Sequence, residues 1–117
     1  MSGSYATQVT LLPGSTCSGV TVQDASTAVT HAPGATSLTL SHAGTSYSGT
    51  VDTAGNFHTA PKTVVVSPAH YVISITGHFT TTGLDATVTV EQTDPTSCSY
   101  TVGWVGTKSG PPNVIPG

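Results

Sequence analysis

Histidine is the side chain in this sequence best suited to chemistry, because imidazole binds metal ions and exchanges protons near neutral pH. The chain of 117 residues has five histidines although only 6% of its residues are charged. They are His31, His42, His58, His70 and His78. No two stand two residues apart, the spacing that places two imidazoles on one face of a strand. The sequence therefore holds no local metal motif.

Two hypotheses remain for these histidines. His58 and His78 could meet across neighbouring strands, and Asp52 lies close to His58 in one predicted hairpin, so a metal site or a His–Asp acid–base pair is one hypothesis. The other, which we favour, is that they are ordinary surface or loop residues, with His42 and His70 in turns. We therefore assign no metal ligand and no cofactor.

The carboxylates do not form a recognisable catalytic pair. A glycosidase needs two facing carboxylates, and no spacing singles out such a pair among Asp24, Asp52, Asp85, Glu91 and Asp94. No Ser stands in a G-x-S-x-G context, and no Gly-rich loop precedes a predicted helix. The sequence therefore identifies no catalytic residue, and we lean towards a protein that is not an enzyme.

The low charge excludes several kinds of partner. Lys62 and Lys108 are the only Lys residues, Arg is absent, and the formal net charge is −3. Binding of nucleic acids or anionic membranes needs clustered Lys and Arg, and no run approaches the ~18 apolar residues of a spanning helix. We predict no nucleic-acid partner, no membrane insertion, and a monomer or weak homo-oligomer.

The elements that must position any site are strands, because apolar and polar residues alternate along most of the chain. The alternation is clearest at 70–91, where two amphipathic arms flank a Thr-Thr-Thr-Gly turn that ends at Gly83. The chain has 23 Thr, a β-branched residue that supplies both strand propensity and a polar outer face. This composition indicates an all-β protein.

The arrangement of these strands predicts one domain, residues 1–117, built as an antiparallel up-and-down β-barrel of about eight strands. An Ig-like β-sandwich is the alternative fold. We expect residues 24–36 to form a loop or lid and residues 110–117 an extended tail. The segments predicted as strands are 4–12, 17–23, 37–41, 46–52, 56–67 with an interruption at Pro61, the two arms of 70–91, and 98–108.

The two cysteines, Cys17 and Cys98, lie far apart in sequence and outside any C-x-x-C motif. A disulfide is the first hypothesis, and two free buried thiols are the alternative. A disulfide and a charge-poor, Thr-rich surface favour a secreted protein or one of the periplasm or cell envelope. We interpret Met1 as a start placed where a signal peptide was removed.

Three segments carry a resemblance to a known group of proteins. They are the opening Gly3-Ser4-Tyr5, the hairpin SYSGTVDTAGNF at 46–57 and the closing CSYTVGW at 98–104. Together they resemble small secreted bacterial β-barrels of the lipocalin/avidin type, although the Gly-x-Trp opening of lipocalins is Gly-x-Tyr here. The resemblance implies an up-and-down barrel.

The functional prediction depends on the apolar faces of the strands. Large residues share these faces with the small residues Gly49, Gly77 and Ala86, so they either fill a core or line a cup for a small apolar ligand. The residues predicted to line the cup are Tyr47, Tyr71, Ile73, Phe79, Tyr100 and Trp104. We predict a small-ligand-binding barrel; the alternatives are a self-associating structural or adhesive module and a small hydrolase-type enzyme that uses His and Asp at the barrel mouth.

Overall fold

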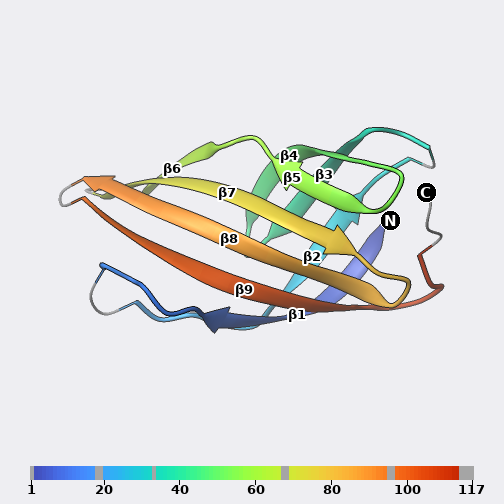
Figure 1. Ribbon diagram of the computed structural model, residues 1–117, viewed down its shortest axis with the longest axis horizontal. Coiled ribbons are helices and arrows are strands. Elements are labelled where there is room, and N and C mark those ends of the chain that lie inside the picture. The colour runs from blue at the N-terminus through green and yellow to red at the C-terminus, as the bar shows by residue number, and fades with distance from the viewer. Residues whose placement is uncertain (1, 18–19, 33, 67–68, 95–96, 114–117) are drawn as a thin grey trace.

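The computed structural model describes residues 2–17, 20–32, 34–66, 69–94 and 97–113, and its regular elements are all strands (Figure 1). No helix among these residues is long and apolar enough to cross a membrane. The strands are β1 Gly3–Leu11, β2 Ala25–Thr30, β3 Ser37–His42, β4 Thr45–Val51, β5 Asn56–Thr59, β6 Lys62–Val66, β7 Ala69–Phe79, β8 Gly83–Asp94 and β9 Cys98–Lys108.

These strands close into an antiparallel up-and-down barrel, as the sequence predicted. The sheet order is β5-β4-β3-β2-β1-β9-β8-β7-β6, and β5 also pairs with β7 and completes the ring. The first strand pairs with the last, from Tyr5 opposite Lys108 to Leu11 opposite Val102. A sandwich lacks this closure, so the alternative fold is wrong.

The nine strands occupy eight strand positions around the barrel, here called staves. This is because β5 and β6 both pair with β7 and follow one another along it. Phe57 of β5 pairs with Gly77 of β7, and Val64 of β6 pairs with Tyr71 further along β7. The interruption falls at residues 60–61, where Pro61 has no N–H to donate to a ladder. The predicted break in this strand is confirmed.

The staves differ in length, and the two ends of the barrel therefore differ. Strands β7, β8 and β9 have 11, 12 and 11 residues, whereas β2 and β3 have six each. As a result, β6–β9 extend well beyond β2–β4 on the left of Figure 1. We call this the projecting end; the capped end is the opposite one, where β1 begins and β9 finishes.

Asn113 closes the capped end. Its side chain is 4% exposed; Oδ1 accepts hydrogen bonds from Tyr5 Oη (3.1 Å) and Lys108 Nζ (2.8 Å), and Nδ2 donates to Thr80 O (2.9 Å). Its backbone N–H donates to Thr81 O (2.8 Å). Of the predicted tail at 110–117, residues 110–113 contain no strand or helix and are held here through Asn113, and residues 114–117 lie outside the described residues.

The interior between the two ends is packed with apolar side chains. Phe79 lies between two other rings, with centroid distances of 4.7 Å to Phe57 and 6.0 Å to Tyr5. The space expected beside Gly77 is occupied, because a Cβ built there would lie 2.7 Å from Phe57 Cζ and 2.8 Å from Ala86 Cβ. At this level the small residues accommodate neighbouring rings and leave no cup.

Two segments differ from the sequence prediction. Residues 24–36 are not a loop or lid, because Ala25–Thr30 forms β2, which pairs with β1 and β3. The alternation of β2 is hard to recognise because its inward positions are Ala25, Thr27 and Val29, of which only Val29 is large and apolar. Residues 17 and 20–23, predicted within a strand, belong to no strand, and residues 18–19 of that segment lie outside the described residues.

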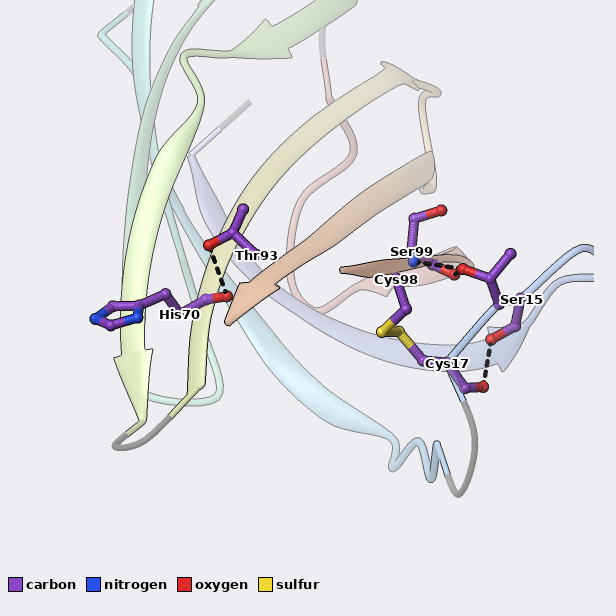
Figure 2. Close-up of a disulfide and its surroundings, with 7 residues drawn as sticks. Ser15, Cys17, His70, Thr93, Cys98 and Ser99 are labelled. Atoms are coloured by element: carbon purple, nitrogen blue, oxygen red, sulfur yellow. Dashed lines mark hydrogen bonds between the residues drawn. A yellow bond between two sulfur atoms is a disulfide. The ribbon is translucent and has the colours of Figure 1, made fainter. Parts of the chain in front are cut away.

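The predicted disulfide is confirmed and lies at the projecting end. Cys17, which follows β1, is bonded to Cys98, the first residue of β9, with a Cα–Cα distance of 5.1 Å (Figure 2). Residues 12–16 lead to it along the outside of β9, where Leu12 N donates to Thr101 O (2.9 Å) and Thr16 N to Ser99 O (2.8 Å). The bond thus ties the chain after β1 to the neighbouring strand.

Replacing both cysteines, Cys17→Ser with Cys98→Ser, should lower the free energy of unfolding by about 4 kcal/mol, because the unfolded chain regains the freedom of a long loop. Urea unfolding followed by circular dichroism measures the loss. Wild-type protein treated with a reductant is the matched control and should show the same midpoint as the double variant. An unchanged midpoint in both samples would contradict this account of the disulfide.

The filled core is tested by Gly77→Ala, which should lower the free energy of unfolding by about 1–3 kcal/mol because the new methyl group overlaps the Asp85 carbonyl oxygen, the Phe57 ring and Ala86. The control is Gly103→Ala, whose Cβ would meet only Leu12, at 3.4 Å. Chemical denaturation of the two variants compares them. Equal stabilities would mean that the barrel has free space beside Gly77.

Candidate functional site

Three tyrosines from three strands converge at the projecting end. Tyr47 of β4 is 7% exposed, whereas Tyr71 of β7 and Tyr100 of β9 are half-buried. Tyr100 interacts electrostatically with both of the others. Tyr71 and Tyr100 also pack against the apolar core that contains Tyr47, so we treat the three residues as one tyrosine group. Tyr71 and Tyr100 keep a solvent-accessible surface at the end of the barrel where the staves are unequal.

Burial keeps the phenols of Tyr47 and Tyr100 uncharged. It raises the pKa of Tyr100, and the neighbouring Tyr71 raises it further. Burial also raises the pKa of Tyr47. A hydrogen bond with Thr45 lowers this pKa, and the neighbouring Tyr100 raises it. Protonated phenols both donate and accept hydrogen bonds. The group is thus an apolar surface with neutral polar tips.

His42 points into the barrel and packs on Trp104. It is the last residue of β3, on the same face as the buried Leu38 and Leu40, and its ring stacks on the indole with a centroid distance of 4.1 Å and an interplanar angle of 27°. The turn that follows takes only two residues, Ala43 and Gly44, both with positive φ. The prediction that His42 lies in this turn is therefore wrong, because His42 is still part of β3.

A buried chain of hydroxyl groups holds the His42 ring. Its Nδ1 lies 2.8 Å from Thr27 Oγ1, which lies 2.8 Å from Thr7 Oγ1. Thr27 is fully buried and Thr7 is 3% exposed. Burial lowers the pKa of His42, so the imidazole is neutral at pH 7. Its hydrogen-bonding partner is a hydroxyl and not the carboxylate that a His–Asp pair would need.

The six residues predicted to line a cup lie in different parts of the barrel. Tyr47, Tyr71 and Tyr100 form the group at the projecting end, and Ile73 is aligned with Tyr100 through Val90, which pairs with both. Trp104 is buried, and the His42 ring stacks on its indole. Phe79 is fully buried in the core with Phe57 and Tyr5. The structure therefore does not bring Phe79 together with the tyrosines.

The other histidines do not build a site. His58 and His78 lie on the neighbouring strands β5 and β7, but His58 Nε2 lies 3.3 Å from Thr50 Oγ1 and His78 Nδ1 lies 2.9 Å from Asn56 Oδ1. His31 is buried, and its Nε2 donates to Ala35 O (2.7 Å). Across the described ranges, no group of three or more His, Cys, Asp or Glu side chains could hold a metal ion.

Asp52 acts in a turn and not in a catalytic pair. Its Oδ1 accepts hydrogen bonds from the backbone N–H groups of Ala54 (3.0 Å) and Asn56 (2.9 Å), and Oδ2 accepts from Asn56 Nδ2 (3.2 Å). These bonds lower the pKa of Asp52, and the bond from the Asn56 side chain has the largest effect. Asp52 therefore caps the backbone amides of the β4–β5 connection.

A groove of about 460 Å³ lies between β4, β5 and β7. Its lining includes the exposed polar residues Thr50, Asp52, His58 and Thr76. None of the six predicted ligand-binding residues lines it. The groove is therefore separate from the tyrosine group.

Comparisons with known proteins give no further identification: no family model, no curated protein and no solved structure matches this chain. What is established is the architecture, a closed eight-stave antiparallel barrel with one disulfide.

The buried position of His42 predicts a pH dependence of stability. Because its pKa is lower in the folded protein, the unfolded chain binds a proton first as the pH falls below about 6.5, and the free energy of unfolding decreases from there towards the folded-state pKa. In a His42→Gln variant this component is absent. Thermal unfolding from about pH 7 to pH 5 should therefore show the two proteins converging in stability as the pH falls; parallel profiles would contradict the prediction.

Proposed function

We propose that this protein is a secreted or cell-envelope barrel that binds a small, uncharged, largely apolar ligand at its projecting end. The observation that carries the proposal is the grouping of Tyr47, Tyr71 and Tyr100; Trp104, on which His42 stacks, follows Tyr100 on the same face of β9. A few polar groups set among aromatic rings are the usual lining of a small-molecule site.

The choice of end follows from packing. Asn113 and its hydrogen bonds occupy the capped end, and rings fill the space beside Gly77. Tyr71 and Tyr100, by contrast, are half-buried, so an apolar ligand that covers them removes further apolar surface from water. The projecting end is therefore the part of the barrel where a bound ligand would remove the most apolar surface from water.

The chemistry of this end selects against charged ligands. Burial raises the pKa of the Tyr47 and Tyr100 phenols and lowers the pKa of the His42 imidazole, so these three groups are neutral at pH 7. Of the two lysines, Lys108 lies at the capped end, where its Nζ donates to Asn113 (2.8 Å). Lys62 pairs with Ile73 at the start of β6, and its Nζ donates to Ser46 O (2.6 Å). An anionic ligand would have to shed its water and displace that bond to reach this single cation, which is unfavourable.

Two coarser features support the cellular setting. The Cys17–Cys98 disulfide is consistent with an oxidising compartment outside the cytoplasm. The eight-stave up-and-down barrel has the architecture of lipocalin-like and avidin-like proteins, which is the resemblance noted in the sequence. Secretion and a ligand-carrying role of that kind are part of this proposal.

The proposal is tested with N-phenylnaphthylamine, a neutral apolar dye, by titration while the fluorescence of Trp104, the only tryptophan, is recorded. We expect saturable binding with a change in Trp104 emission. Tyr71→Ala and Tyr100→Ala should each weaken binding by about tenfold, because each removes an aromatic contact. Thr87→Ala, an exposed substitution on β8, is the control and should bind like the wild type. No saturable binding, or equal binding by all four proteins, would refute the site.

A second candidate, a self-associating structural module, is favoured by one observation. Strand β6 has β7 as its only strand neighbour among the described strands, and Val65 on it is 59% exposed. An unpaired edge of this kind can pair with another chain. Light scattering after size-exclusion chromatography tests this, since a strict monomer at high concentration excludes it and assembly abolished by Val65→Lys supports it.

A further inference from the structure

We infer that the ligand carries an O–H or N–H group on a flat apolar body, as a phenol or an indole does, and that Nε2 of His42 accepts its hydrogen bond. The inference rests on the proposed function and narrows the class of ligand. It is carried by the buried hydroxyl chain behind His42, which determines where the imidazole proton lies.

Donor counting along this chain has one complete solution. Thr7 Oγ1 donates its single proton to Tyr5 O (3.3 Å), so in the contact between the two hydroxyls Thr27 must be the donor. Thr27 then has no proton left for the imidazole, and Nδ1 of His42 must donate to Thr27 Oγ1. The neutral ring has one N–H, so Nε2 carries a lone pair.

The opposite tautomer leaves a buried hydrogen bond unmade. If Nε2 held the proton, Thr27 would donate to Nδ1, Thr7 would donate to Thr27, and the bond from Thr7 to Tyr5 O would be lost. Thr7 and Thr27 are too buried for water to replace that bond. The lost bond therefore favours the tautomer with a free Nε2.

Nε2 is available to a ligand. No described residue forms a hydrogen bond with Nε2. Because Nε2 is also not buried, it has contact with solvent. The Trp104 ring is stacked against the imidazole, and Tyr100 lies on the same face of β9, four residues before Trp104. An acceptor beside flat apolar surface is matched by a donor group on an aromatic ring.

The test compares two probes that differ only in the donor, α-naphthol and its methyl ether, by isothermal titration of the full chain at about pH 7, where the imidazole is neutral. We expect α-naphthol to bind about three- to tenfold more tightly, the effect of one net hydrogen bond. Thr27→Val removes the acceptor that orients Nδ1–H and should reduce this preference; Thr76→Val, an exposed substitution on β7, should retain it.

A second measurement needs no ligand and no variant. Proton–nitrogen correlation NMR on the labelled protein should show the His42 proton on Nδ1 and an unprotonated Nε2; a proton on Nε2 overturns the inference. In the titrations, equal affinities for the two probes overturn the inference and leave the proposed function intact. If α-naphthol, its methyl ether and N-phenylnaphthylamine all fail to bind, the inference and the proposed function are both overturned.

Discussion

The rest of the structure depends on the pairing of the first strand with the last. The β1–β9 ladder turns an open sheet into a barrel, and only then does each strand have an inner and an outer face. This seam is held at both ends. The Cys17–Cys98 disulfide ties the chain after β1 to the start of β9, and Asn113 joins Tyr5 of β1 to Lys108 of β9. Two devices of different chemistry thus secure the same pair of strands.

Closure also explains how polar side chains can lie inside so small a barrel. Thr7, Thr27 and His42 come from β1, β2 and β3, which are adjacent staves, and each satisfies the hydrogen-bonding group of the next. A buried polar group without a partner would destabilise the fold, whereas this chain holds the imidazole in one position against Trp104. The arrangement links the seam of the barrel to the candidate site at the projecting end.

Much of the fold could be predicted from the sequence, because period-two alternation identifies a strand wherever its inner residues are large and apolar. The 70–91 hairpin appears as β7 and β8, and the break near Pro61 divides β5 from β6. Strand β2 could not be recognised in this way because its inner positions are the small Ala25, the polar Thr27 and only one large apolar residue, Val29. For His42, the parity of Leu38 and Leu40 was the available signal, but it gave no indication that the turn begins only at Ala43.

The sequence by itself thus determined an all-β protein of amphipathic strands with a single possible disulfide, whereas the choice between barrel and sandwich came from the strand pairing. Only the tertiary structure decided which aromatic residues meet: Phe79 joins the core, whereas Tyr71 and Tyr100 remain half-buried beyond the short staves. The reason is physical. Alternation along a strand reports which face a residue occupies, but its level in the barrel depends on strand register and unequal stave lengths, which are set by contacts between residues distant in sequence.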